Sequence, residues 1–183
     1  MKKYIIITVI FSIISILLLG ACSFRGAHFL RRFFDNDDDM ANKRFEQFLE
    51  AAENKDKATL EAMFSTKTIT EVDNFSETTD SLLNFFQGNH VTYDRSGGGG
   101  SDEDREGEHH SKCVYSSYVV ETSEERYYFA IREFTIDTSD EDNIGISSLY
   151  IINAKDTDEQ FTYWGDGEWT PGINFNKDQE HED

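Results

Sequence analysis

Two adjacent histidines flanked by acidic residues could form a metal site. His109 and His110 follow Glu106 and Glu108, and imidazole and carboxylate groups are both zinc ligands. Neighbouring side chains on a strand point to opposite faces, however, and the upstream run of glycines offers no rigid frame for tetrahedral ligands. We therefore expect residues 96–110 to form a flexible, exposed polar loop, and we predict no metal ligands.

An acidic stretch has the spacing of a calcium-binding loop. Asp35, Asp37, Asp39 and Glu46 stand at positions one, three, five and twelve of the EF-hand pattern. That pattern needs glycine at position six for its sharp turn, whereas Met40 stands there. The residues that follow have helical spacing, so the stretch indicates a solvated acidic helix start. Weak association with calcium is the alternative.

Cys113 is the one candidate nucleophile in the body of the chain. It lies beside Val114 and Tyr115 at the start of a strand-like run, and nothing in the sequence marks a general base near it. The chain contains no phosphate-binding loop, nucleophile elbow or zinc-protease helix motif. We expect Cys113 to be a buried structural cysteine, and we predict no cofactor.

The N-terminus has the features of an export signal. Met1-Lys2-Lys3 precedes an apolar run over residues 4–19, which is shorter than the ~20 residues that a membrane span needs but suits a secretory signal. The run ends in Leu18-Leu19-Gly20-Ala21-Cys22, which resembles the bacterial lipobox. The resemblance implies cleavage between Ala21 and Cys22 and a diacylglyceryl group on the Cys22 sulfur. An uncleaved signal anchor is the alternative.

Lipidation would hold the protein on the outer face of the cytoplasmic membrane. Each buried methylene contributes roughly 0.8 kcal/mol, so two acyl chains make a stable anchor. We assign residues 1–21 to the signal peptide and residues 22–38 to the lipidated cysteine and a tether. In this tether the apolar and basic residues fall on opposite sides of a helix: Phe29, Leu30, Phe33 and Phe34 against Arg25, His28, Arg31 and Arg32. The tether either lies in the lipid interface or packs back on the domain.

The part of the chain that follows the tether is strongly acidic. From Asp35 onwards the chain has 36 acidic and 12 basic residues, a formal charge of −24. Such a field repels phosphates and argues against nucleic acid as a partner.

With Cys22 lipidated, Cys113 has no partner for an internal disulfide. Residues 39–176 are enough for one domain with a packed core, and residues 177–183 form an acidic tail.

The pattern of apolar residues changes midway along this domain. Helical spacing predicts one helix over residues 41–52, a second after a turn at which Asp56 is the N-cap, and a third over residues 72–86 that ends at Gly88. Branched and aromatic residues then predict strands over 91–93, 113–121, 126–136 and 144–154. Helices followed by strands indicate an α+β domain, with N-terminal helices packed on a curved antiparallel sheet. Strands that are apolar on both faces predict that both faces are covered.

Several segments resemble known families. Phe45-Glu46-Gln47-Phe48-Leu49-Glu50, Asn54-Lys55-Asp56-Lys57 and the run over residues 60–64 resemble the first helices of cystatin-like, nuclear-transport-factor-2-like domains. The runs over residues 145–151, 163–167 and 169–173 are similar to clostridial lipoproteins of domain of unknown function family 5104. The resemblance implies a cystatin-like cone of helices and sheet in an exported, lipid-anchored protein, and it brings no catalytic residues.

In some domains of this fold an acid works in the cone between the helices and the sheet. The resemblance makes Asp137 and Glu133 candidates, with a solvated loop or edge residue as the alternative for each. The aromatic side chains of the strands and tail could line a ligand pocket, although filling the core is the default. These residues are Tyr127, Phe129, Phe134, Tyr150, Phe161, Tyr163, Trp164 and Trp169.

Three hypotheses for function follow. The first is a lipid-anchored module without catalytic activity that binds a partner protein, an envelope component or a small ligand, with a partner or a second copy docking on the sheet face. The second is a hydrolase or isomerase that uses a carboxylate with a raised pKa inside the cone. The third is a weak binder of divalent cations.

Overall fold

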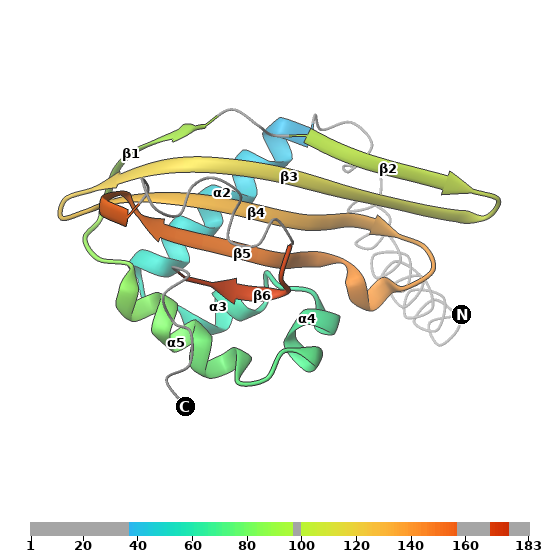
Figure 1. Cartoon of the computed structure of the whole chain (residues 1–183), viewed down its shortest axis with the longest axis horizontal. Coiled ribbons are helices and arrows are strands. Elements are labelled where there is room, and N and C mark those ends of the chain that lie inside the picture. Colours follow the sequence, from blue (N-terminus) through green and yellow to red (C-terminus); the bar gives the residue numbers. More distant parts are fainter. Residues whose placement is uncertain (1–36, 97–99, 157–168, 176–183) are drawn as a thin grey trace, which may run out of the picture. The chain divides into compact units, whose positions relative to one another are not determined.

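The computed structural model describes residues 37–96, 100–156 and 169–175. The chain divides into two units, Met1–Met40 and Ala41–Asp183, and the sheet belongs to the second. The described residues contain four α-helices and six strands (Figure 1), and none of the helices is long and apolar enough to cross a membrane. The predicted signal peptide, Cys22, Asp35 and the acidic tail lie outside the described residues.

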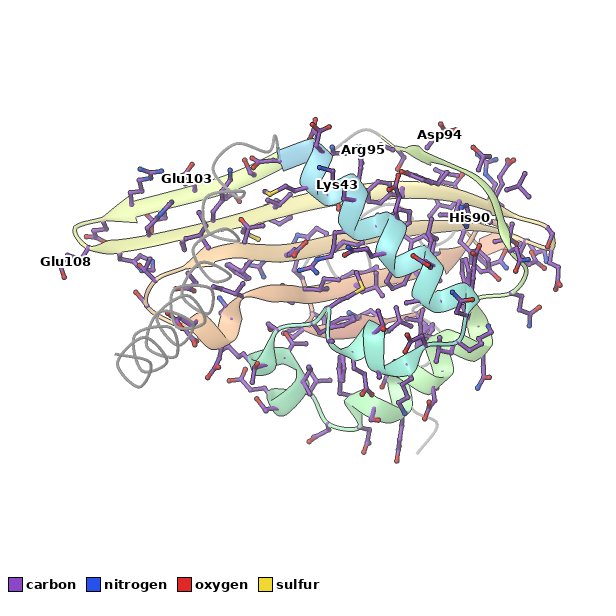
Figure 2. The ribbon with its side chains drawn as sticks, turned by 180° about the vertical axis from the view of Figure 1, so that it is seen from behind. Lys43, His90, Asp94, Arg95, Glu103 and Glu108 are labelled. Atoms are coloured by element: carbon purple, nitrogen blue, oxygen red, sulfur yellow. The ribbon has the colours of Figure 1, made fainter. Side chains whose placement is uncertain are left out.

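Helix α2 (Asp37–Glu53) covers one face of the sheet (Figure 2). Its first turn carries Asp37, Asp38 and Asp39, whose charges favour the positive end of the helix dipole. This confirms the acidic helix start. Its buried face repeats at helical spacing: Ala41, Phe45, Phe48, Leu49, Ala51 and Ala52. The turn that follows ends at Asp56, whose side chain caps α3 (Lys57–Glu61) by accepting a hydrogen bond from the backbone N–H of Thr59 at 3.1 Å.

The third predicted helix, over residues 72–86, is present but shorter, and the structure has an additional short helix before it that was not predicted. Helix α4 (Thr66–Glu71) is capped by Ser65 and ends at Val72, which has extended backbone angles. Helix α5 (Phe75–Phe85) starts after Asn74, whose φ of 57° is left-handed. Such a residue turns the chain sharply, so α5 starts three residues later than predicted. Helix α4 has no apolar periodicity to reveal it, because its one buried residue is Thr68.

The sheet has the strand order β1-β3-β4-β5-β6, with β2 also paired to β3. Its strands are β1 (His90–Arg95), β2 (Gly100–Glu106), β3 (His109–Thr122), β4 (Arg126–Asp137), β5 (Gly145–Asn153) and β6 (Gly172–Asn174), with single 3₁₀ turns at η1 (Glu141–Asn143) and η2 (Ala154–Asp156). The α+β class is confirmed. The expectation of a wholly antiparallel sheet was wrong, because β6 pairs with β5 in parallel.

The predicted flexible loop is largely a strand. Residues 100–106 form β2 and pair in antiparallel register with β3, from Gly100 opposite Tyr115 to Glu106 opposite His109. Gly107, at φ +63°, lies in the turn. All seven residues of β2 are exposed. Acidic residues have low strand propensity, so β2 depends on its pairing with β3, and its charges discourage pairing of this edge with another sheet.

Aromatic rings fill the space between α2 and the sheet. Phe45 is fully buried and stacks on Tyr118 with ring centroids 3.8 Å apart. It also meets Phe129 edge-on at 5.3 Å and Phe48 at 5.9 Å. Leu149 and Ile151 of β5 are fully buried in the same cluster. The default assignment of aromatic residues to the core is confirmed for Tyr127 and Phe129, which belong to this cluster.

The opposite face of the sheet is covered as well. Ala130 and Ser148 are fully buried there, and Tyr150 is 6% exposed. Trp169 packs against Tyr115 and Tyr150, with ring centroids 5.4 and 5.7 Å away, and the backbone N–H of the next residue donates to the Tyr150 hydroxyl at 2.8 Å. The prediction that both faces are covered is confirmed.

Candidate functional site

Asp137, the first candidate acid, closes the turn after β4. Its Oδ1 accepts hydrogen bonds from the backbone N–H groups of Ser139 and Asp140, and its Oδ2 accepts one from the side chain of Asn143, all at 3.0 Å. Burial alone would raise the pKa of Asp137, but the hydrogen bonds from Asn143, Asp140 and Ser139 lower it below its ordinary value. A general acid at neutral pH needs a raised pKa, so Asp137 suits a structural role. The alternative of a solvated residue was wrong, because its side chain is buried.

Replacing Asp137 with Ala leaves three donors without this acceptor, and we expect a loss of about 1–3 kcal/mol in the free energy of unfolding at pH 7. A lowered folded-state pKa stabilises the fold above the unfolded pKa of about 4, and this stabilisation is lost as the pH falls through the folded-state value. The difference between wild type and Asp137→Ala should therefore shrink below about pH 4. Urea unfolding at neutral and at acidic pH measures this difference in the free energy of unfolding. An equal difference at both pH values would contradict the predicted pH dependence.

Glu133, the second candidate acid, is bound by a guanidinium from α2. The Nε and Nη2 of Arg44 donate to Oε1 of Glu133 at 3.0 and 2.9 Å. The Glu133 side chain is 13% exposed, so this pair is a largely buried connection between α2 and β4. Removing either partner would leave the other charge uncompensated. Glu133 is therefore engaged in joining helix to sheet.

The two histidines lie at the start of β3 and point to different partners, as adjacent strand residues must. The Nε2 of His110 contacts Oε1 of Glu103 at 2.8 Å, and Nδ1 of His109 contacts the Ser139 hydroxyl. Glu106, which was grouped with them, lies on exposed β2. Across residues 37–96, 100–156 and 169–175 no three His, Cys, Asp or Glu side chains come together in a way that could hold a metal ion.

The described acidic positions of the calcium-loop pattern, Asp37, Asp39 and Glu46, lie on α2. Asp37 and Asp39 are in its first turn and Met40 follows within the helix. Glu46, nearly two turns after Asp39, accepts a hydrogen bond from the Tyr93 hydroxyl at 2.7 Å. A helical backbone cannot bring positions three, five and twelve around one ion. The rejection of an EF-hand therefore agrees with the geometry of the described positions.

Cys113 is buried within β3, as predicted, with 5% of its surface exposed. Burial raises the pKa of its thiol, and the opposing effect of a hydrogen bond with Arg132 is smaller. Since the thiolate is the reactive form, a buried thiol with a raised pKa is a poor nucleophile. Cys113 therefore packs as a small apolar residue on the sheet face opposite α2.

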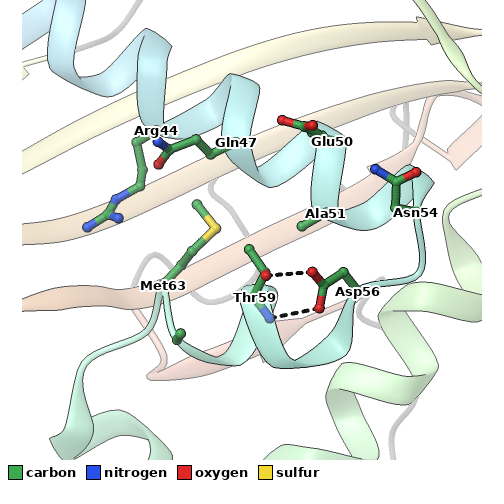
Figure 3. A pocket seen from close by; sticks show the side chains of 9 residues that line it. Arg44, Gln47, Glu50, Ala51, Asn54, Asp56, Thr59 and Met63 are labelled. Atoms are coloured by element: carbon green, nitrogen blue, oxygen red, sulfur yellow. Dashed lines mark hydrogen bonds between the residues drawn. The ribbon is translucent and has the colours of Figure 1, made fainter.

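A groove of about 480 Å³ lies between α2 and α3, on the outside of the helical layer (Figure 3). Its lining comprises Arg44, Gln47, Glu50, Ala51 and Asn54 of α2 and its C-terminal turn, with Asp56, Thr59, Ala62 and Met63 in and around α3. Ala51 and Met63 are buried and give the groove a small apolar floor. Most of the polar side chains around this floor are exposed.

The groove carries two carboxylates. Oδ2 of Asp56 accepts from the Thr59 hydroxyl at 2.6 Å, beside the cap bond to the Thr59 backbone. These two hydrogen bonds lower the pKa of Asp56. Glu50 lies across the groove on α2 (Figure 3). Within the described residues, the side chains of Gln47, Glu50 and Asn54 make no hydrogen bond or ion pair.

The groove was missed by the sequence reasoning, which treated Asp56 only as a helix cap. A polar face on α2 is visible in the sequence, because Gln47, Glu50 and Asn54 recur at helical spacing. Every amphipathic surface helix has such a face, however. The groove exists because α3 folds back beside α2 after the turn, and that placement depends on tertiary packing.

A match to a protein-family model covers this same region. The family model described as Domain of unknown function (DUF5104) matches residues 47–154. This chain belongs to the DUF5104 family. The matched span includes every residue of the groove lining except Arg44, together with β1 to β5, so the groove belongs to the DUF5104 domain and not to the flanking segments. No curated protein matches the chain.

Proposed function

We propose that this DUF5104 chain is a lipid-anchored module on the outer face of the cytoplasmic membrane, and that it binds a partner protein through the groove between α2 and α3. The charged start, the apolar run and the Leu18-Leu19-Gly20-Ala21-Cys22 segment support export and lipidation at Cys22. The family membership and the packing of α2 across a curved sheet support the relation to clostridial-type lipoproteins with a cystatin-like or nuclear-transport-factor-2-like fold.

The position of the exposed polar side chains supports the binding proposal. The space between α2 and the sheet, where an enzyme of this fold would hold its substrate, is occupied by stacked rings such as Phe45 and Tyr118. The groove on the other side of α2 presents amide and carboxylate groups to solvent. Pockets for small ligands are mostly apolar and enclosing, whereas an open surface with polar walls suits a segment of another protein.

The alternative functions have less support. A hydrolase or isomerase would need a free acid in the cone, and both Asp137 and Glu133 are held by hydrogen bonds. Docking of a partner on the sheet face would need exposed apolar area. In the described ranges the exposed large apolar residues are Ile69 and Val91, which lie on α4 and on edge strand β1.

Site-specific photocross-linking in the native bacterium tests this proposal. A photoreactive residue replaces Gln47 in the groove of the full-length protein, and a matched variant carries it at Asn84, an exposed position of α5 outside the groove. We expect one defined protein adduct from position 47 and none from position 84. Equal adducts from both positions, or none from either, would show that the groove is not a binding surface.

A further inference from the structure

We infer that the groove between α2 and α3 accepts a cationic segment, in which a Lys or Arg side chain from an extended stretch of the partner protein lies between Glu50 and Asp56. This inference rests on the proposed function, because it names the chemistry of the partner for the same groove. It goes further than that function, which requires only that some protein binds there.

The groove leaves negative charge uncompensated. Glu50 and Asp56 are its two carboxylates, and the hydrogen bonds from Thr59 favour the charged form of Asp56. The one basic side chain in the lining, Arg44, is already paired with Glu133. The described lining therefore has two negative charges available and no positive one, which favours a cationic partner.

The two lysines that flank Asp56 in the sequence are directed away from the groove. The Nζ of Lys55 donates to the backbone carbonyl of Phe86 at 2.8 Å and to that of Leu83, both at the end of α5. The Nζ of Lys57 binds Oδ2 of Asp80 on α5 at 2.6 Å. These contacts hold two cations on the α5 side, so neither of these lysines pairs with Glu50 or Asp56.

The dimensions and the remaining groups suit an extended peptide. Gln47 and Asn54 are seven residues apart on α2 and its C-terminal turn, so at 1.5 Å per residue they are separated by about 10 Å along the axis. That is the length of about three residues of extended chain. Their amides can both donate to and accept from a peptide backbone. Ala51 and Met63 offer apolar contact to the methylene stem of a lysine or arginine.

The whole domain favours the approach of such a segment. From Asp35 onwards the formal charge is −24, and a field of this sign increases the rate of encounter with cations at low ionic strength. That attraction acts over the entire surface and is not specific for the groove. A test must therefore separate the groove carboxylates from the general charge.

The experiment measures binding of short peptides to the full-length lipoprotein in nanodiscs made of neutral lipid. The probe is a fluorescent peptide of alternating Lys and Ala, compared with Glu-Ala and Ser-Ala peptides of equal length. The test variant is Glu50→Gln with Asp56→Asn, in which Asn still serves as a helix cap. The matched control is Glu71→Gln with Asp73→Asn, which removes the same charge from exposed residues outside the groove.

We expect the Lys-Ala peptide alone to bind, and the groove variant to weaken its binding by about tenfold, as the loss of two charge contacts implies. The control variant should stay within about twofold of wild type. Circular dichroism should show both variants folded. Equal weakening by both variants, absence of binding to wild type, or groove-dependent displacement of the peptide by calcium would each overturn the inference.

The two proposals can fail separately. An adduct from position 47 in cells, combined with no affinity for the Lys-Ala peptide, keeps the groove as a binding surface and rejects the cationic partner. Absence of both rejects the groove. If both succeed, mass spectrometry of the adduct should place the cross-link in a segment that contains Lys or Arg. A cross-linked segment without basic residues contradicts the inference.

Discussion

Replacing Gly145 with Ala is expected to destabilise the domain by about 2–6 kcal/mol, because it combines backbone strain with a steric clash. Gly145 has a φ of +129°, which L-residues rarely adopt. A Cβ there would lie 2.7 Å from the backbone nitrogen of Ser65 and 2.9 Å from the carbonyl carbon of Phe64. Neither atom can move freely, because the Ser65 N–H donates to the Ile146 carbonyl at 3.0 Å and the Ile146 N–H donates to the Met63 carbonyl at 3.0 Å.

Two other glycines separate the effect of backbone strain on stability from the effect of the steric clash. Gly107 also has a positive φ but open space around its Cβ position, so Gly107→Ala measures the strain alone. Gly100 has open space and no positive φ, and Gly100→Ala should leave the stability within about 0.5 kcal/mol of wild type. Thermal and urea unfolding measure all three variants. A Gly145→Ala variant no less stable than Gly107→Ala would show that the segment after α3 does not pack closely on β5.

Replacing Phe45 with Ala should cost about 3–5 kcal/mol in the free energy of unfolding, the range measured for truncation of a buried aromatic residue. Its ring is fully buried and packs against rings from α2 and three strands. These rings are Phe48, Tyr93, Tyr118 and Phe129. A loss of this size is a large part of the stability of a domain, so unfolding in urea at moderate temperature is the suitable measurement.

Val91→Ala is the control for Phe45→Ala, because Val91 is 71% exposed, and it should change the free energy of unfolding by no more than about 0.5 kcal/mol. The comparison also bears on function. If Phe45→Ala cost less than about 1 kcal/mol, the space between α2 and the sheet would not be tightly packed. A ligand could then bind inside that space.

The parts of the fold that follow local rules could be predicted from the sequence. Helix α2, the Asp56 cap and strands β3, β4 and β5 depend on apolar periodicity and on short-range hydrogen bonds. Helix α4 could not be predicted from apolar periodicity, because the one residue that it buries is Thr68, and the left-handed Asn74 separates it from α5. Strand β2 was also missed, since seven exposed and mostly charged residues take strand form only through pairing with β3.

The residues of the candidate site also divide into those whose environment could be predicted from the sequence and those whose environment could not. Burial of Cys113 and the divergence of His109 and His110 follow from strand alternation. The binding of Glu133 by Arg44 joins residues 89 positions apart, and sequence spacing gives no indication of it. The three hydrogen bonds that hold Asp137 come from the turn after β4. Only the conformation of that turn shows that this carboxyl has a lowered pKa.

We propose that this domain acts outside the cytoplasmic membrane on a lipid anchor at Cys22. The most direct test is mass spectrometry of the N-terminal peptide of the protein purified from the membrane fraction of its native bacterium. We predict a mature chain that begins at Cys22 with diacylglyceryl on the sulfur. A Cys22→Ser variant should stay uncleaved, with residues 1–21 still attached. A peptide that begins at Met1 in the unmodified protein, or an unmodified Cys22, would contradict the account.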